Sequence, residues 1–334
     1  MMKHLKWMTA GILGVFAATA LLVGCGSSSQ APVQKKEIVF KAADNQPDDY
    51  PTVLGLKKMA QLLDERTQGR IKMQVYSGGQ LGGEKETIEM TQMGTIAISR
   101  VNSAPLASFS PNMGVLSMPF LFRDATHFWK VLDGDIGKNM LKEMEKSNLI
   151  GLAYYDSGAR SFYTKNKPIN SPADAQGQKI RVQQSKIFVD MVNALGASAT
   201  AMGYGEVYSG LQTGIIDGAE NNPPSLWSAK HYEVCKYFSL DEHAMVPEVV
   251  IMSKKVWDTL SPEDQKIVMQ AAIDSGVFQK QVWADYTTKS INELKNKGVI
   301  ISTPDKAPFR KAVEPMYNNY PEYKDVIAQI QAVQ

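Results

Sequence analysis

A long helical segment near the C-terminus limits the possible folds more than any other feature of this sequence. Ser261 is a typical N-cap residue, Pro262 suits the first helical position, and two acidic residues follow in the first turn. After this start, Gly276 is the only glycine or proline before Gly298. A helix over 261–297 is longer than one compact lobe requires, so we expect it to brace two lobes. The alternative is a pair of helices broken near Gly276.

The chain before this helix alternates strand patterns with helix patterns. Residues 71–76 alternate apolar and polar side chains, as a half-buried strand does. Strands are predicted over 38–43, 71–76, 95–101, 149–155, 179–183, 215–217 and 249–252, and helices after Pro51, from Glu84 and over 188–195. This alternation predicts parallel α/β sheets, and its return in a second block predicts two lobes.

The N-terminus has the pattern of an export signal. A basic start precedes an uncharged apolar stretch over 8–23, which is shorter than the about 20 apolar residues of a membrane span. Leu-Val-Gly-Cys ends this stretch and resembles a bacterial lipobox, in which cleavage leaves a lipid-bearing Cys25. We expect a lipoprotein signal peptide over 1–24, a flexible tether over 25–36, and a protein anchored in the periplasm or at the cell surface. An ordinary signal peptide is the alternative.

Charge and cysteine content bear on the possible partners. Removing residues 1–24 takes two of the 36 basic residues away, and the remaining 34 equal the number of acidic residues. A net charge near zero gives no electrostatic reason to expect binding to nucleic acid. Cys235 is the only cysteine besides Cys25, so we expect it to be a buried apolar residue.

The sequence lacks the common enzyme signatures. It contains no G-x-S-x-G, no H-E-x-x-H and no Gly-Lys-Ser/Thr phosphate loop. His127, His231 and His243 do not have metal-ligand spacing, and we expect them at the surface or at helix caps. We therefore expect a protein that is not an enzyme, with no cofactor and no metal.

Polar side chains near strand ends indicate a site for an organic acid. Arg160 and Asn221 follow predicted strands, and Arg181 lies within one. In open α/β sheets ligands bind beyond the carboxyl ends of the strands, and a guanidinium can donate two parallel hydrogen bonds to a carboxylate. The three side chains would form a fork for a planar carboxylate, unless Arg160 is a surface residue and Arg181 belongs to an ion pair.

Five longer segments occur in a recognisable order. They are 79–84 (GQLGGE), 118–122 (MPFLF), 179–182 (KIRV), 205–208 (GEVY) and 211–221 (LQTGIIDGAEN). Together they resemble the DctP-type extracytoplasmic solute receptors of tripartite ATP-independent periplasmic (TRAP) transporters, and the match runs from about residue 38 to residue 320. The resemblance implies a Venus-flytrap fold, in which two α/β lobes close on a ligand and a long helix braces both. It also implies the membrane subunits of a TRAP transporter as partners.

The same resemblance implies roles for individual residues. Arg181 would make the bidentate contact to the ligand carboxylate, and Tyr204 would pack its ring on the ligand unless it is a core aromatic. The full set of expected ligand-binding residues is Arg181, Arg160, Asn221, Glu84, Asn102, Tyr204, Gln183, Asn45, Asn222 and Asp44.

Four segments look like those of family members that bind hexuronates such as D-glucuronate and D-galacturonate. They are 45–47, 157–162, 181–185 and 220–222. Their amides could bind sugar hydroxyls, because an amide offers both donors and an acceptor. The chain departs from these members at Asp44, where similar sequences often have histidine, and at Pro223, where they often have tryptophan. Another organic acid, namely an aldonate, a C4-dicarboxylate or a 2-oxo acid, is therefore an alternative ligand.

The expected organisation places one lobe at 37–156 with about 246–260, the other at 157–245, the long helix at 261–297 and a C-terminal strand and helices at 298–334. Two other classes of protein stay open. One is an exported enzyme acting on acidic sugars, with Glu84 or Asp44 as base and Arg181 holding the carboxylate. The other is the receptor of an ATP-driven importer, against which the long helix and the 212–221 segment argue.

Overall fold

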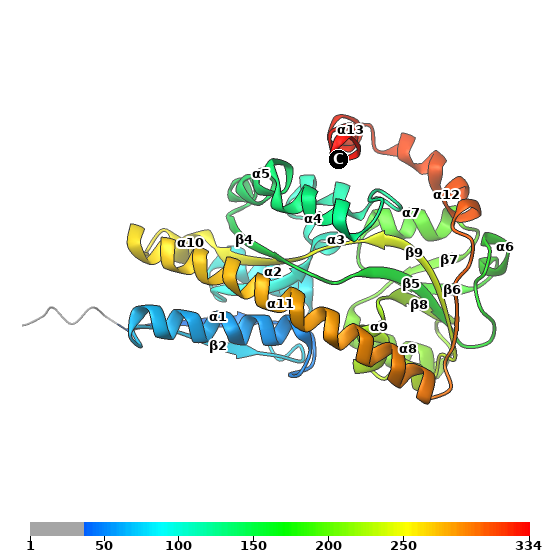
Figure 1. The fold of residues 1–334 in the computed structure, drawn as a ribbon, viewed down its shortest axis with the longest axis horizontal. Coiled ribbons are helices and arrows are strands. Elements are labelled where there is room, and N and C mark those ends of the chain that lie inside the picture. Colours follow the sequence, from blue (N-terminus) through cyan, green and yellow to red (C-terminus); the bar gives the residue numbers. More distant parts are fainter. Residues whose placement is uncertain (1–36) are drawn as a thin grey trace, which may run out of the picture. The chain divides into compact units, whose positions relative to one another are not determined.

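The computed structural model describes residues 37–334, which form two β-sheets with helices packed around them (Figure 1). The expected signal peptide over 1–24, Cys25 and the tether over 25–36 lie outside the described residues. Two sheets, each with its own helices and joined by one long helix, confirm the predicted two-lobed α/β fold.

The first sheet has five strands in the order β2-β1-β3-β10-β4. Strand β1 runs parallel to β2 and β3, whereas β10 is antiparallel to β3 and β4. The strands are β1 Ile38–Ala43, β2 Ile71–Tyr76, β3 Ile98–Asn102, β4 Leu149–Tyr155 and β10 Glu248–Ser253. The expectation of parallel sheets is thus wrong for this one, because the chain returns from the other lobe beside the C-terminal end of β3, where Glu248 pairs with Asn102, and β10 then runs back between β3 and β4.

The second sheet has six strands in the order β11-β9-β5-β8-β6-β7. Strand β5 is antiparallel to β8 and β9, whereas β6 is parallel to β7 and β8, and β11 is parallel to β9. The strands are β5 Ala159–Thr164, β6 Lys179–Val182, β7 Ser198–Ala201, β8 Gly218–Asn221, β9 Tyr237–Met245 and β11 Ile300–Ser302. This sheet is also mixed, and it carries both arginines predicted for the site, Arg160 on β5 and Arg181 on β6.

Helices cover the faces of both sheets. Those of the first half of the chain are α1 Pro51–Thr67, α2 Glu84–Met93, α3 Ser103–Leu106, α4 Ala125–Asp133 and α5 Asp135–Glu143. Those that follow are α6 Pro172–Ala175, α7 Lys186–Ala194, α8 Val207–Thr213, α9 Pro223–Ser228, α10 Lys254–Trp257, α12 Ala307–Val313 and α13 Lys324–Ala332. The helices predicted after Pro51, from Glu84 and over 188–195 are confirmed as α1, α2 and α7.

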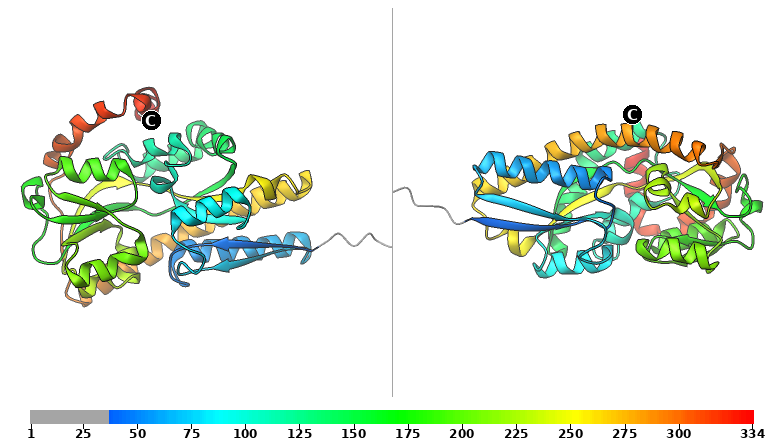
Figure 2. Two further views of the ribbon diagram at one scale, coloured as in Figure 1. Left: turned by 180° about the vertical axis from the view of Figure 1, so that it is seen from behind. Right: turned by 90° about the horizontal axis from the view of Figure 1, so that it is seen from below.

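The long helix α11 spans Pro262–Asn296 without a break, which excludes the alternative of two helices. The Ser261 hydroxyl accepts a hydrogen bond from the Asp264 amide at 3.1 Å, as expected of an N-cap. Helix α11 packs on α1 and β4 of the first lobe and on α9 of the second (Figure 2). The predicted brace is therefore confirmed.

Helix α11 also holds the chain where it crosses from β4 to β5. The buried Gln279 amide accepts from the Asp156 backbone N–H at 2.7 Å and donates to the Asp156 carbonyl at 2.9 Å. Next to this clamp, the Ser157 hydroxyl donates to the carbonyl of Val246, which lies in the return crossover from β9 to β10. The two connections between the lobes are thus bonded to each other and to the long helix.

One predicted strand is misplaced, and this affects the site. Residues 215–217 are not a strand, and Ile215 is exposed, because Gly214 ends α8 in a left-handed conformation and the Ile216 amide bonds back to Gly210. The strand begins at Gly218 instead. Asn221 therefore lies within β8 rather than after the strand.

We expect Gly218→Ala to destabilise the fold and with it the site on β8. A Cβ atom at this position would lie 2.5 Å from the Tyr163 carbonyl oxygen and 2.7 Å from a Thr164 methyl carbon. Overpacking of this kind costs about 1–3 kcal/mol of unfolding free energy. Urea denaturation measures it, and Gly205→Ala is the matched control, since a Cβ there would meet nothing within 4 Å. Equal stability of the two variants would contradict the prediction.

Cys235 is fully buried in an apolar cluster of the second lobe, as predicted. Within residues 37–334, no helix is long and apolar enough to cross a membrane.

Candidate functional site

A small polar cavity lies between the two sheets. The space open to the centre of a water molecule is about 20 Å³, which is room for about one water. The lining residues are Asn45, Gln46, Glu84, Arg100, Asn102, Arg160, Arg181, Gln183, Tyr204, Asn221, Ser225 and Glu248. Eight of the ten residues proposed from the sequence are among them, and only Asp44 and Asn222 are not. Both lobes contribute to the lining.

Arg181 is a buried cation without a carboxylate partner among the described residues. It points from β6, and its Nε and Nη2 donate to the Met202 carbonyl oxygen at 3.0 and 2.7 Å. No hydrogen bond occupies its Nη1 within residues 37–334. Burial lowers the pKa of Arg181 below its ordinary value, which is the mark of a charge that lacks compensation. The Tyr204 ring lies beneath its guanidinium, 5.9 Å from centroid to Cζ. An anion in the cavity would supply the missing charge.

Arg160, from β5, is by contrast fully engaged. It forms a two-point ion pair with Glu220 on β8, with 2.9 Å from Nη2 to Oε1, and its Nη1 donates to Asn221 Oδ1 at 3.0 Å. Burial opposes ionisation of Glu220, but Arg160 and His243 outweigh it and hold the pKa of Glu220 at about 2. Arg160 therefore positions Asn221 and adds positive potential to the cavity.

The three histidines of the described residues are buried, so the expectation of surface positions is wrong. His127 does bond a helix start, however: its Nδ1 accepts from the Arg123 backbone N–H at 3.1 Å, just before α4. His243 lies behind Glu220, with its Nδ1 2.8 Å from Asp241 Oδ2. Burial opposes its charge, but Asp241 and Glu220 raise the pKa of His243 to about 9. His231 bonds the Tyr163 hydroxyl at 2.7 Å, and His127 bonds the Ile330 carbonyl at 2.9 Å. Within residues 37–334, no group of three or more His, Cys, Asp or Glu side chains could hold a metal ion.

The first lobe contributes a cluster of carboxylates around Arg100 on β3. The Arg100 guanidinium donates to Asp44, to Glu248 Oε2 at 2.7 Å and to Glu84 Oε1 at 3.3 Å. Its Nη2 also donates to Asn45 Oδ1 at 2.7 Å. Arg100 is almost completely buried, so this cluster fixes the side of the cavity that faces Arg181 and Arg160.

Asp44 and Asn222 lie behind the lining and hold it in place. Asp44 accepts from Arg100 Nε at 2.9 Å, from the Thr52 hydroxyl at 2.8 Å and from the backbone N–H of Gln46 at 2.8 Å. Asn222 accepts from the Ser225 amide at the start of α9, and its Nδ2 donates to the Ser157 carbonyl at 3.0 Å. Neither side chain reaches the cavity in this structure.

Sequence reasoning missed four lining residues: Gln46, Arg100, Ser225 and Glu248. Arg100 had a signal, since it is the one charged side chain in the strand pattern predicted over 95–101. Glu248 precedes the apolar run over 249–252 and so lies at a strand end, which is the position that drew attention to Arg160. Ser225 had no signal in the sequence.

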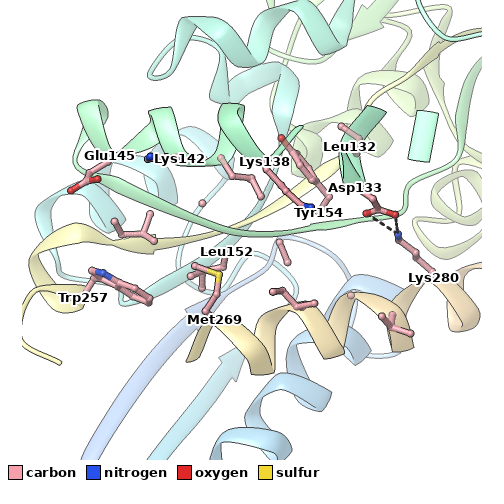
Figure 3. Close-up of a pocket in the computed structure, with 17 residues that line it drawn as sticks. Leu132, Asp133, Lys138, Lys142, Glu145, Leu152, Tyr154, Trp257, Met269 and Lys280 are labelled. Atoms are coloured by element: carbon pink, nitrogen blue, oxygen red, sulfur yellow. Dashed lines mark hydrogen bonds and ion pairs between the residues drawn. The ribbon is translucent and has the colours of Figure 1, made fainter. Parts of the chain in front are cut away.

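A much larger groove elsewhere is lined mainly by apolar side chains, although Lys138, Lys142 and Lys280 also reach it. The groove between α5, β4 and α11 has a volume of about 680 Å³, and apolar side chains such as Leu152, Trp257 and Met269 line it (Figure 3). Hydroxyl groups of a ligand would find few partners there. The small polar cavity is therefore the candidate site.

Comparison with known proteins identifies the family. Residues 42–323 match the model of the family described as bacterial extracellular solute-binding protein, family 7 (DctP). The chain belongs to this family. The family recognised from the sequence is thus confirmed, as are the function as a TRAP-type solute receptor and the location outside the cytoplasm.

Solved structures of this family are similar over nearly the whole described chain. A TRAP periplasmic solute-binding protein from Xanthobacter autotrophicus with bound β-D-galacturonate is 46% identical, with a TM-score of 0.86 over 88% of this chain and 100% of that chain. One from Pseudomonas putida with bound D-glucuronate is 41% identical, with a TM-score of 0.87 over 89% and 98%. A solute-binding protein from Chromohalobacter salexigens is 36% identical over 86% of this chain and 87% of its own length.

Proposed function

We propose that this receptor binds a hexuronate, D-glucuronate or D-galacturonate, and delivers it to the membrane subunits of a TRAP transporter. The observation that carries the proposal is Arg181, a buried cation whose Nη1 is unoccupied by any described residue and which faces a polar cavity. A carboxylate suits this position, because guanidinium and carboxylate match as a two-point pair. Similar structures that hold galacturonate and glucuronate support the choice of acid.

The remaining lining residues suit the rest of a sugar acid. Amides of Asn45, Asn102, Gln183 and Asn221 surround the cavity, and each can both donate to and accept from a hydroxyl group. Tyr204 offers an aromatic face next to Arg181. We propose that Asp44 and Asn222, although among the residues expected from the sequence, act through Arg100 and α9 rather than by touching the ligand.

Binding in this site requires the lobes to move apart and close again. A cavity with room for about one water cannot admit a hexuronate in the conformation described. We propose lobes over 37–156 with about 246–260 and over 157–245, because the chain crosses between the sheets at 156–158 and 246–247. The carboxylate would bind Arg181 in the open cleft, and closure would bring Glu84, Asn45 and Asn102 over the hydroxyls.

The test is a ligand panel measured by thermal shift and confirmed by calorimetry with purified protein. Ligand that binds only the folded state raises the melting temperature by mass action. A shift with glucuronate or galacturonate supports the proposal. A shift with C4-dicarboxylates, aldonates or 2-oxo acids alone would keep the receptor and reject the hexuronate. Recovery of chemically altered sugar acid would instead support an enzyme.

We also propose that Cys25 carries a lipid after cleavage of residues 1–24. The lipobox-like Leu-Val-Gly-Cys sequence and the Gly/Ser-rich stretch that follows support this. Metabolic labelling with a palmitate analogue tests it: wild-type protein should be labelled and found with membranes, whereas Cys25→Ala should be neither. Equal labelling of both forms would reject the anchor.

A further inference from the structure

The carboxylate cluster of the first lobe carries more negative charge than its single cation balances. Asp44, Glu84 and Glu248 all lie within ion-pair distance of Arg100. The Arg100 side chain is 1% exposed and those of the three acids are 0%, 16% and 9% exposed, so water screens this excess poorly. Three ionised carboxylates beside one guanidinium repel one another strongly in such surroundings. Protonation of one carboxylate reduces the excess negative charge.

Hydrogen bonding shows which of the three acids is free to hold the proton. Both oxygens of Asp44 accept hydrogen bonds, and so do both oxygens of Glu248, from Arg100 at 2.7 Å and from Asn102 Nδ2 at 3.0 Å. Glu84 differs. Its Oε1 accepts from the backbone N–H of Asn102 at 2.8 Å and from Arg100 Nη1 at 3.3 Å, but no described residue bonds its Oε2. Glu84 also lines the cavity, so a proton on Oε2 would face the ligand.

A bound acid would increase the demand for this proton. Across the cavity, Arg160 is balanced by Glu220 and His243 by Asp241, whereas Arg181 has no such partner among the described residues. A ligand carboxylate neutralises Arg181 and so removes the one uncompensated positive charge that faced Glu84. The charged and titratable groups around Glu84 are Arg100, Asp44 and Glu248 on its own lobe and Arg160, Arg181 and Tyr204 across the cavity, with Glu220 paired to Arg160 behind the lining.

We propose that Glu84 takes up a proton from solvent when the cleft closes on a sugar acid, and that its Oε2–H donates a hydrogen bond to a ligand oxygen. This inference rests on the proposed function, since it needs a carboxylate ligand in the same cavity. It makes Glu84 a specificity-determining residue: the site presents a hydrogen-bond donor at this position only in its protonated form. Release of the ligand returns the proton to solvent, so charge is conserved over the cycle.

The electrostatics of the described conformation, in which both lobes enclose Glu84, agree with this geometry. Burial raises the pKa of Glu84 from 4.5 to about 7, with Arg100 opposing the rise and Glu248 adding to it. In an open, solvated cleft this burial is lost, and the pKa returns toward its ordinary value of 4.5. A group whose pKa is higher in the closed state favours closure at low pH and loses that contribution as pH rises through about 7. Linkage then predicts roughly 25-fold tighter binding at about pH 5.5 than at about pH 8.

Isothermal titration calorimetry with glucuronate and galacturonate tests the proposal. Wild-type protein is titrated between about pH 5.5 and about pH 8, and at neutral pH in phosphate and in Tris, whose ionisation enthalpies differ. We expect the fall in affinity given above and a buffer-dependent enthalpy that corresponds to uptake of about half a proton at pH 7. Affinity that is independent of pH, together with no proton uptake, would overturn the proposal.

A neutral residue at position 84 tests proton uptake separately from the hydrogen bond to the ligand. Glu84→Gln keeps an acceptor for the backbone N–H of Asn102 and presents an N–H toward the ligand. This variant should therefore still bind the hexuronate. Its affinity should be independent of pH, and binding should take up no proton. Glu89→Gln, an exposed position on the same helix, should behave as wild type. A Glu84→Gln protein that keeps the pH dependence would assign the proton elsewhere and overturn the proposal. If wild-type protein binds no hexuronate at all, the proposed function fails instead, and the two failures are distinguishable.

Discussion

Replacing Arg181 with alanine is expected to reduce hexuronate binding by about 100-fold to 10,000-fold. Each charge-assisted hydrogen bond contributes about 1.5–3 kcal/mol net, and the fork would make two with the ligand carboxylate. The variant also leaves that carboxylate in a closed cavity beside Glu84 and Glu248 without its cation. A receptor with micromolar affinity would thus have a Kd of roughly 0.1 to 10 mM after the substitution. Titration calorimetry or competitive thermal shift measures the change.

Lysine at the same position is expected to weaken binding badly as well. An ammonium group is a point donor and cannot span two carboxylate oxygens, and it must also satisfy the Met202 carbonyl that Arg181 now bonds twice. We expect a loss of at least about tenfold in affinity for Arg181→Lys. Near-wild-type affinity would contradict a two-point clamp at Arg181.

The folding stability of Arg181→Ala and Arg181→Lys, measured without ligand, is the control for their binding defects. Arg181 is buried without a described carboxylate partner, and its pKa is lowered, so the charge itself costs folding free energy. Arg181→Ala should therefore unfold at the same denaturant concentration as wild type or a higher one, in the absence of ligand. Arg66→Ala is the matched control: it removes a half-exposed ion pair with Asp274 and should leave ligand affinity unchanged. A general loss of structure in Arg181→Ala would make its binding defect uninformative, and Arg181→Lys would then decide.

The long helix shows what local sequence can predict. Its N-cap at Ser261, the proline after it and the absence of a second interruption are all local signals, and the structure confirms them. Gly276 did not break the helix, because it packs on β4: a Cβ atom there would lie 3.2 Å from the Tyr154 carbonyl oxygen. Close packing rather than a bend explains this glycine, and packing between elements cannot be read from a local pattern.

Sheet topology was not predictable for the same reason. The strand patterns at 149–155 and 249–252 were recognised, but nothing in either indicates that β10 lies antiparallel between β3 and β4. Gly218 shows the limit at single residues: the apolar pair before it suggested a strand, whereas the chain enters the sheet only where a glycine fits against Tyr163. Strand direction and exact bounds depend on partners far along the chain.

The residues of the candidate site also fall into two groups, those that the sequence predicted and those that it did not. Residues of the second lobe, such as Arg181 and Asn221, lie in segments with strong family resemblance and were found, although their roles stay a prediction. The carboxylate cluster was only partly foreseen, because Asp44, Glu84 and Glu248 come from distant parts of the chain and meet only around Arg100. Asp44 was expected to touch the ligand, and its hydrogen bonds to Arg100 and Thr52 instead hold it behind the lining.

Removing Glu220 is expected to produce the largest loss of stability. Its side chain is fully buried and bonds Arg160 at both oxygens, with His243 Nε2 3.5 Å away. Glu220→Ala leaves the buried Arg160 without a carboxylate partner and leaves His243 with Asp241 alone, and the positive charge of Arg181 acts on Arg160 as well. Breaking a buried ion pair by removing one partner costs about 3–5 kcal/mol of unfolding free energy, a large share of the stability of an ordinary protein. Urea denaturation at neutral pH measures it.

The Arg160–Glu220 ion pair also predicts how the unfolding free energy changes at acid pH. The pKa of Glu220 is lowered from 4.5 to about 2, so the contribution of Glu220 to stability is fully present above about pH 4.5 and is lost as pH falls toward 2. Wild-type protein should therefore lose stability over this window, and Glu220→Ala should lack that part of the loss. Glu37→Ala, which removes an exposed pair with Lys72, should change stability by less than about 1 kcal/mol. A similarly small effect of Glu220→Ala would mean that Arg160 does not depend on Glu220 for its charge balance, because Asn221 and backbone carbonyls would then suffice.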